Sequence, residues 1–285
     1  MSDARLPAWL SDVKRLPVLP NDVHRLIKVL TDDSLDFKSL SNQLQAHQSI
    51  VSRLLALANS AWVGSKEPVT SIEQACFKLG LNIVRGVSIG LAVMKPFNVA
   101  FCPAFDLKRY WACSLLVAQA AGLLANQMPA LEKSFHDAGT LHTAGILHNI
   151  GILCLADIKP QETLMVLKHK MAQPEITLIQ AFREAIDTDY CEVGGFLMEM
   201  WGISEALATC VRYHRASDYE GAYAEQAKLV GIAADWVRSL YRHCKPTPSA
   251  YLERHAIDIS RQEAIFRMLE LEFHKVNESA ATLFH

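Results

Sequence analysis

The segment Leu141–Gly151 holds the densest group of polar side chains within an otherwise apolar stretch. His142 is followed by Thr143, and His148 is followed by Asn149, with a glycine on each side of the second pair. Burying such groups costs about 1–3 kcal/mol each unless they find hydrogen-bond partners. Because imidazole serves as a metal ligand and as a general base, the segment indicates a metal-binding or active-site helix. The alternative, more common for core histidines, is a hydrogen-bonded pair that fixes helix packing.

The elements that must position these residues are helices. Apolar side chains recur with helical spacing, as at Val23, Leu26, Ile27 and Leu30, and no run alternates as a half-buried strand would. The sequence therefore predicts an all-α fold of many short helices joined by short loops, with no significant sheet. Its start and stop signals, in chain order, are Asp36, Ser49, Ser71 with Gln74, Gly80, Asn82, Asp106, a junction at Gly202 and Ser204, and Ser260 with Glu263.

Two irregular stretches divide this succession of helices. Asn98–Pro103 follows Pro96 and ends on a second proline. It predicts a boundary between an N-terminal helical half, residues 1–100, and a C-terminal half, residues 101–285. Pro246–Pro248 predicts a second break before the last helices.

Composition and charge exclude several classes of protein. Of the 285 residues, 51% are hydrophobic and 20% are charged, which excludes a disordered, collagen-like or disulfide-scaffold chain. The formal net charge of -2 leaves no global basic surface, so we expect no nucleic-acid partner. The seven cysteines form no C-x-x-C pair and lie mostly in apolar patterns, so we expect buried thiols in a reducing cytosol.

The N-terminus and the apolar stretches predict a cytoplasmic protein without a membrane segment. The first residues, MSDARLPAWLSD, lack the basic start and apolar run of a signal peptide. The longest apolar stretch, Cys113–Ala125, is shorter than the roughly 20 residues that a membrane-spanning helix needs.

Other patterns indicate structure rather than chemistry. The sequence contains no G-x-S-x-G elbow, phosphate-binding P-loop or dinucleotide-binding glycine motif. Gly86–Gly90 predicts close helix packing, and Asn59 with Ser60 predicts hydrogen bonds to a neighbouring helix end or loop. The dipeptide His136-Asp137 predicts an exposed loop or cap. A modest basic face that we expect to be solvated comprises Lys14, Arg15, His24, Arg25 and Lys28.

The motif around His148 is similar to a known one. Gly145–Gly151 resembles the G-L-L-H-D-I-G motif of the HD superfamily. Further segments resemble the HDOD family, the HD-related output domain, in this order along the chain: Leu16–Pro20 (L-P-x-L-P), Leu54–Ala61 (L-x-L-A-N-S-A), Val69–Gly80 (V-x-S-I-x-x-A-x-x-x-L-G), Glu192–Gly194 (E-V-G), Trp201-Gly202 (W-G) and Tyr213-His214 (Y-H). The ordered set spans about residues 14–240 and implies an HD-like multi-helix core joined to an additional N-terminal helical half.

The resemblance also implies positions for metal ligands, because catalytic HD proteins hold one or two divalent cations with histidines and aspartates. The corresponding positions here are Cys113, His148, Asn149, Tyr190, His214 and Asp235. Asn149 offers a neutral carbonyl where aspartate would supply an anionic oxygen. Tyr190, a phenol with a reference pKa of about 10, is a poor replacement for an imidazole.

These departures from the family pattern predict that a two-metal hydrolytic centre is absent and that no cofactor is expected. They leave open a single divalent cation held by His148, His214 and Asp235. In that case Cys113 would be able to add a thiolate ligand.

The resemblance implies a regulatory module of bacterial signal transduction that has no catalytic residues and acts through a protein partner. Because almost the whole chain is the HDOD region, we expect a stand-alone copy whose sensor lies on another chain. Two alternatives remain open. One is a metal-dependent phosphohydrolase acting on a nucleotide or cyclic dinucleotide. The other is a receptor that holds a nucleotide between the halves, with Arg212, Arg215 or lysines, without cleaving it.

Overall fold

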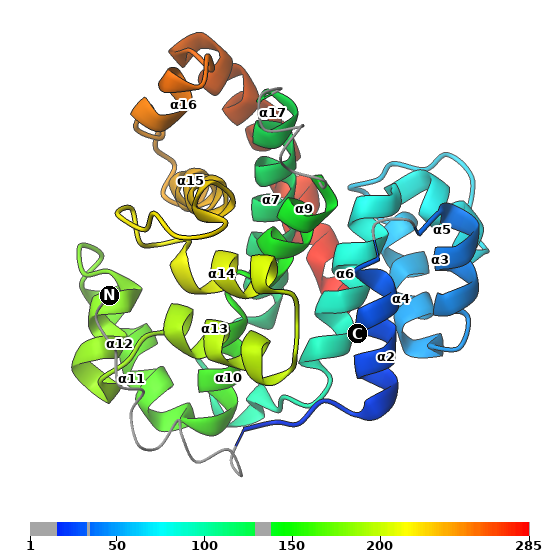
Figure 1. Ribbon diagram of the computed structural model, residues 1–285, viewed down its shortest axis with the longest axis horizontal. Helices are drawn as coiled ribbons and strands as arrows, with labels where there is room; N and C mark the ends of the chain where they lie inside the picture. Colours follow the sequence, from blue (N-terminus) through cyan, green and yellow to red (C-terminus); the bar gives the residue numbers. More distant parts are fainter. Residues whose placement is uncertain (1–15, 33–34, 129–137, 285) are drawn as a thin grey trace.

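The computed structural model describes residues 16–32, 35–128 and 138–284, and every regular element in these ranges is a helix (Figure 1). The predicted all-α fold is therefore confirmed. The four longest helices are α6 (Leu81–Met94), α7 (Leu107–Asn126), α15 (Ala224–Tyr241) and α17 (Ile259–Ser279). The shorter ones, in chain order, are α2 (Asn21–Leu30), α3 (Phe37–Leu44), α4 (Gln48–Ala58), α5 (Ile72–Leu79), η2 (Val99–Phe101), α9 (Ala138–Leu147), α10 (Ile150–Ile158), α11 (Pro160–Ala172), α12 (Leu178–Ile186), α13 (Tyr190–Met200), α14 (Glu205–Tyr213), α16 (Ala250–Arg254) and η3 (Ala280–Leu283).

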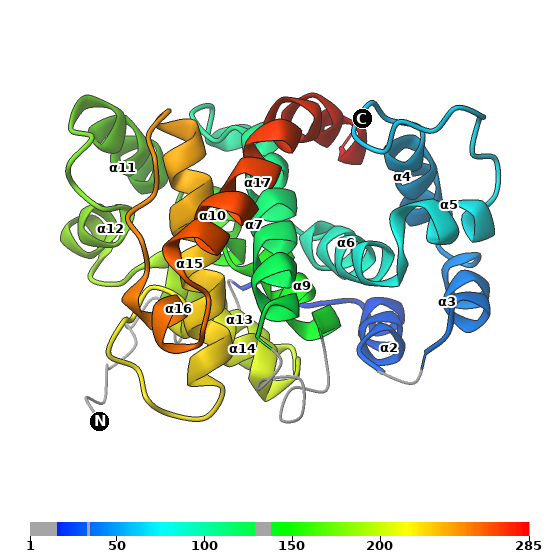
Figure 2. The same ribbon diagram turned by 90° about the horizontal axis from the view of Figure 1, so that it is seen from above.

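The helices form two neighbouring groups joined by α6 and α7 (Figures 1 and 2). In the N-terminal group, α2, α4 and α5 pack against α6. In the larger group, α7 lies centrally and packs against α9, α15 and α17, while α13 packs between α10 and α14. Because α6 also packs against α9, one continuous set of buried apolar side chains runs through both groups.

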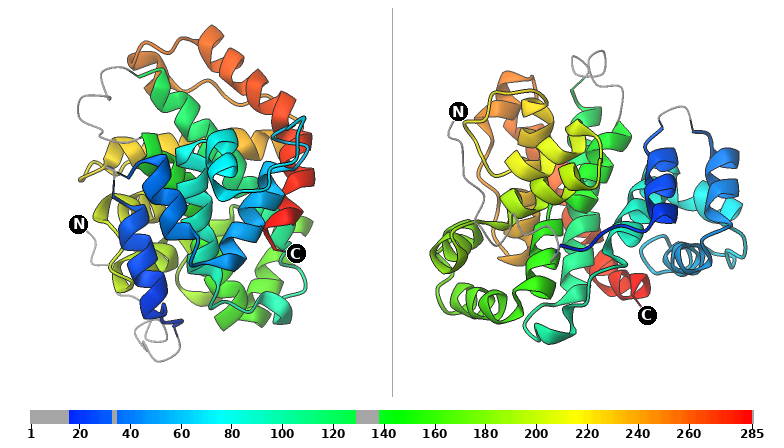
Figure 3. Two further views of the ribbon diagram at one scale, coloured as in Figure 1. Left: turned by 90° about the vertical axis from the view of Figure 1, so that its right-hand side faces the viewer. Right: turned by 60° about the horizontal axis from the view of Figure 1, so that its bottom comes forward.

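The end of the chain returns to the N-terminal group. The short helix η3 packs against α4 and α7, which brings the last described residues beside the N-terminal group (Figure 3). The backbone N–H of Trp62 donates to the Ser279 hydroxyl at 3.2 Å, and its indole N–H donates to Glu272 at 2.7 Å. Residues beyond 270 therefore help to cover the predicted first half, residues 1–100.

The predicted N-terminal caps of the helices agree with the structure at some positions and not at others. The predicted start at Ser49 is wrong, because α4 already includes that residue. The predicted capping box at Ser260 is also wrong, because the Asp258 carboxylate caps α17 by accepting the backbone N–H three residues later. The predicted caps that the structure confirms are Asp36, Ser71 and Asp106.

Small residues allow two of the core helices to approach closely. A Cβ atom added at Gly86 would lie 3.0 Å from the His142 ring, and one at Gly90 would lie 2.7 Å from Ile146. The predicted packing role of Gly86–Gly90 is thus confirmed, since α6 meets α9 along these residues.

One stretch within the described residues is long and apolar enough to cross a membrane. It is Gly139–Ile158, with mean hydropathy 1.4, and the prediction that Cys113–Ala125 is the longest apolar stretch is wrong in this respect. Within the fold 83% of this stretch is buried, because α6, α7, α13 and neighbouring helices cover it. Helices α5 and α6 pass the same test only when taken together, and they are bent by 114°.

Candidate functional site

The pair His148-Asn149 lies at a break between two helices and not inside one. Helix α9 ends at Leu147, and α10 begins at Ile150. His148 is only 3% exposed, and its Nδ1 lies 2.7 Å from the Gly145 carbonyl oxygen. Because a carbonyl oxygen can only accept, Nδ1 carries the ring proton and donates it, which leaves the lone pair of Nε2 unused by this bond. The predicted continuous helix through this motif is therefore wrong.

Glycine after the pair allows α10 to touch α13. A Cβ atom added at Gly151 would lie 1.8 Å from the backbone oxygen of Tyr190, a distance that no side chain can occupy. This close approach brings the first turn of α13 against the break, and with it Tyr190 and Cys191, which are both buried.

His214 completes a cluster of buried rings with His148 and Tyr190. The two imidazole centroids are 5.4 Å apart and the rings are nearly perpendicular, at 85°. The Tyr190 ring is centred 6.1 Å from that of His214, and the Cys191 sulfur lies 3.9 Å from Nε2 of His214. Nδ1 of His214 donates to the Val211 carbonyl at 2.9 Å. The structure thus brings together three of the predicted site residues: His148 from the break between α9 and α10, Tyr190 from the start of α13 and His214 from the end of α14.

Burial keeps both imidazoles neutral. The pKa of His148 is lowered to about 4, mainly because burial disfavours the imidazolium; the Arg215 guanidinium adds to this and the Gly145 hydrogen bond opposes it. Burial also places the pKa of His214 well below its ordinary value, with His148 and Arg215 contributing. The pKa of the Cys191 thiol is raised well above its usual range, again chiefly by burial. The cluster therefore contains neither a thiolate nor a charged imidazole near neutral pH.

Asp235, the predicted carboxylate ligand, is held by two arginines. Arg215 donates to its Oδ1 at 2.6 Å, and Arg238 donates to the same oxygen at 2.5 Å. The side chain of Asp235 is 50% exposed, whereas that of Arg215 is 18% exposed and faces the histidines closely enough to lower their pKa values. A permanent cation thus stands next to the imidazoles, where it repels a metal ion.

Two other predicted residues also fail to join a ligand set. The groups that affect the Cys113 thiol are Arg109, Tyr241 and Asp106, none of which belongs to the histidine cluster. The Asn149 side chain is half-buried at the start of α10 and does not cap it. Across residues 16–32, 35–128 and 138–284, no group of three or more His, Cys, Asp or Glu side chains is arranged to hold a metal ion. The residues present do not fit the metal centre of catalytic HD proteins.

The predicted ligand cations of the receptor alternative are engaged elsewhere. Arg212 forms a two-point ion pair with Glu199, in which its Nη2 donates at 2.8 Å, and Arg215 is bound to Asp235. The dipeptide His136-Asp137 and the basic residues Lys14 and Arg15 lie outside the described residues.

The structural role predicted for Asn59 is confirmed. Its Nδ2 donates to the Val69 carbonyl at 2.8 Å, and its Oδ1 accepts from the Val69 N–H at 2.7 Å. This two-point bond ties the end of α4 to the connector before α5.

His142, which the sequence placed in the same polar segment as His148, is buried, and burial lowers its pKa to about 4. Its Nδ1 has no hydrogen-bond partner among the described residues, so the predicted alternative of a hydrogen-bonded histidine does not hold for this atom. Arg215 was considered only as a ligand cation, although its place next to His214 in the sequence indicated a shared site.

The arrangement of helices and the degenerate HD motif define an HD-like helical domain. A scan against known protein families matches the HDOD domain over residues 16–217, which is more than half of the chain. The chain belongs to the HDOD family. No curated protein matches it significantly.

Solved structures with similar folds come from several bacteria. A candidate signal transduction protein from Marinobacter aquaeolei VT8 superimposes with a TM-score of 0.83 and 22% identity, covering 99% of this chain and 62% of its own length. This chain therefore spans less than two thirds of that protein. An HDOD domain protein of unknown function from Geobacter sulfurreducens has a TM-score of 0.73 and 23% identity, covering 99% and 97% of the two chains. A candidate phosphohydrolase from Shewanella amazonensis SB2B has a TM-score of 0.73 and 21% identity, covering 97% and 98%. At these identities the likeness concerns the fold.

Proposed function

We propose that this chain is a non-catalytic regulatory module of signal transduction that acts by binding another protein. The observation that carries the proposal is the buried cluster itself. Two neutral imidazoles pack edge to face beside the Arg215 guanidinium, and the only carboxylate predicted for the site, Asp235, is bound to two arginines. Such a set can hold helices together, but it lacks the anionic oxygens that would retain a divalent cation and activate water.

Binding to a protein partner is the simplest way for a module without catalysis to transmit a signal. The module contributes no chemistry of its own in this proposal, so its effect must come from the surface that it presents. The Marinobacter protein supports a modular role, because the region similar to this chain makes up only 62% of it. By analogy, this domain works together with other domains, on the same chain or on a separate one.

Metal content and hydrolysis measured on the purified full chain test the absence of catalysis. After incubation with Mn²⁺, Fe²⁺ and Zn²⁺ and gel filtration, we expect substoichiometric metal and no turnover of phosphodiesters or cyclic dinucleotides above the buffer rate. The variant Asn149→Asp restores the family's carboxylate while Arg215 remains bound to Asp235, so we expect it to stay metal-free as well. Metal-dependent turnover by the wild type that is lost in His148→Ala would overturn the proposal and support the phosphohydrolase alternative.

Affinity capture from the source cells, followed by reconstitution with the purified candidate, tests the partner. We expect the capture to yield a protein that, once purified, binds the purified chain saturably in the absence of any other component. Failure to reconstitute any captured protein would contradict the protein-binding part and leave the non-catalytic part standing.

A further inference from the structure

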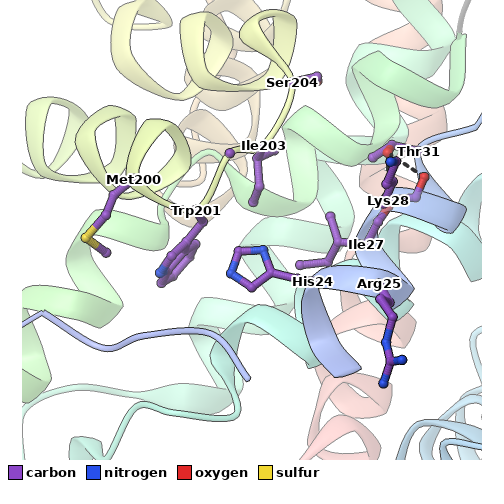
Figure 4. Close-up of a pocket in the computed structure, with 10 residues that line it drawn as sticks. His24, Arg25, Ile27, Lys28, Thr31, Met200, Trp201, Ile203 and Ser204 are labelled. Atoms are coloured by element: carbon purple, nitrogen blue, oxygen red, sulfur yellow. Dashed lines mark hydrogen bonds between the residues drawn. The ribbon is translucent and has the colours of Figure 1, made fainter. Parts of the chain in front are cut away.

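A groove lies between α2 and the turn that joins α13 to α14, so residues from both halves line it (Figure 4). Its volume is about 700 Å³, within the range of roughly 300–1,000 Å³ that is typical of small-molecule sites. Figure 4 shows the imidazole of His24 extending from α2 towards Trp201, with Arg25 and Lys28 on the same helix. The Trp201 indole is fixed, since its N–H donates to the Pro17 carbonyl at 2.9 Å.

The α2 wall of the groove is cationic. His24 and Lys28 are four residues apart and therefore lie on the same side of the helix, with Arg25 beside them. In the described part of the chain none of the three takes part in an ion pair, and no carboxylate residue lines the groove. A guanidinium and an ammonium without a carboxylate partner favour an anion, and the planar donors of arginine fit phosphate especially well.

The opposite wall is formed by the C-terminal end of α13, whose last carbonyl groups are capped by backbone hydrogen bonds. The Ile203 N–H donates to the Met198 carbonyl at 2.9 Å, and the Gly202 N–H donates to the Glu199 carbonyl at 3.0 Å. This pairing ends α13 and requires the left-handed backbone of Gly202, at φ +62°. Ser204 follows as the first residue before α14, and its side chain makes no capping hydrogen bond among the described residues. Its hydroxyl is therefore available to a ligand.

A second cavity, of about 200 Å³, lies beside the groove between α2, α6, α9 and α14 and shares Thr31 and Ser204 with it. Its lining adds the hydroxyl group of Thr143, and the buried Arg85 that also lines it donates to the Asp32 carbonyl at 3.1 Å. A groove of this volume suits a compact ligand, whereas a stable protein partner needs a face of about 800 Å².

We propose that this groove binds a small phosphate-bearing molecule, with the phosphate at Arg25 and Lys28 and the less polar part against Met200 and Ile203. Such a ligand contacts α2 and the α13–α14 turn at once. Binding therefore stabilises the packing of the N-terminal helices against the C-terminal group, which gives the module a way to respond to a metabolite. The site is separate from the histidine cluster and does not depend on whether the protein binds a partner or hydrolyses a substrate.

Isothermal titration calorimetry of the purified full chain at low salt tests the assignment with two probes. One is inorganic phosphate, and the other is a panel of nucleoside mono-, di- and triphosphates with the parent nucleosides as phosphate-free controls. We expect saturable binding of phosphate-bearing probes and none of the nucleosides. The double variant Arg25→Gln/Lys28→Gln should weaken binding by about tenfold or more, because it removes both charge-assisted donors.

A matched variant separates the site from general electrostatic attraction. Lys78→Gln/Lys168→Gln removes the same charge from two exposed lysines on α5 and α11, outside the groove, and should leave the affinity unchanged. If nucleotides bind no tighter than inorganic phosphate, the phosphate assignment holds and free phosphate is the source. The proposal is overturned if neither probe binds saturably, or if both double variants lose affinity equally while their melting temperatures stay at the wild-type value.

Discussion

The buried histidine cluster and the groove beside α2 are both rich in nitrogen-bearing side chains, but they are built in opposite ways. His148 and His214 are nearly inaccessible and neutral, and Arg215 beside them is bound to Asp235. In the groove, Arg25 and Lys28 are exposed and form no ion pair among the described residues. The difference shows that the HD-like motif lies in the core of the fold, while exposed cations without an ion-pair partner among the described residues lie elsewhere.

The largest effect that we expect is the loss of stability in Gly151→Ala, which tests whether the histidine cluster is part of the core. If the cluster is core, Gly151→Ala must push α10 from α13, because the new Cβ would lie 1.8 Å from the Tyr190 oxygen. We expect the free energy of unfolding to fall by about 3 kcal/mol or more, measured by urea denaturation.

Gly122→Ala provides the matched control for that substitution. Gly122 is also a helical glycine, in α7, but a Cβ atom there meets nothing within 4 Å. We expect a change between zero and a gain of about 1 kcal/mol, from the better helix propensity of alanine. Equal losses in both variants would show that the contact with Tyr190 is not what matters.

The second effect is a loss of stability in acid. The pKa values of His142 and His148 are about 4 in the folded protein, below the ordinary value of 6.5, so the unfolded chain binds more protons between these limits. Stability is therefore fully present above about pH 6.5 and falls as pH drops towards 4, by about 1.4 kcal/mol per pH unit for each histidine.

Urea denaturation at a series of pH values measures this slope. Replacing His148 by Gln should make the slope shallower in that window, because the ring that gains a proton on unfolding is removed. A pH-independent stability from 7 to 4.5 would mean that the imidazoles are accessible to protons in the folded state.

A third, smaller effect concerns the Arg215 guanidinium. Arg215→Met removes the guanidinium that lowers the pKa of both histidines, so we expect the pKa of His148 to rise, as measured by NMR titration. The unfolding free energy should fall by about 1–3 kcal/mol, because a half-buried charge-assisted bond is lost. Arg238→Met removes the other partner of Asp235 and should leave the His148 pKa in place.

The smallest effect belongs to the groove. Arg25→Gln/Lys28→Gln without ligand should change the unfolding free energy by less than about 0.5 kcal/mol, because neither side chain forms an ion pair among the described residues. A larger loss would show that these cations support the fold, and that a change in ligand affinity could not be assigned to direct contact.

Local rules made much of the fold predictable. The helical period and the caps at Asp36 and Asp106 depend on neighbours within one turn, and each is as the sequence indicates. The failures at Ser49 and Ser260 arise where several residues could cap and tertiary packing selects one. The break at His148 was not predictable from periodicity, because apolar residues continue through it on both sides.

The residues of the candidate site could be predicted from the sequence, but the ion pairs that they form could not. The motif located His148 and His214, which do meet. It could not reveal that Arg215 and Asp235, twenty positions apart, pair with each other, because that depends on how α14 packs against α15. The prediction that the basic face of α2 is solvated agrees with the exposure of Arg25 and Lys28. The groove beside them was not predictable, because its opposite wall comes from the α13–α14 turn, far along the chain.

The contact of η3 with α4 limits how this protein can be dissected. Deleting the last fifteen residues would remove the Ser279 hydroxyl that holds Trp62, together with the buried Ala280 and Leu283. A shortened chain would therefore lose cover over α4, and a fusion tag attached soon after η3 would lie close to that helix. Point substitutions within the intact chain, with any tag joined through a flexible spacer, are the sounder route to separating its activities.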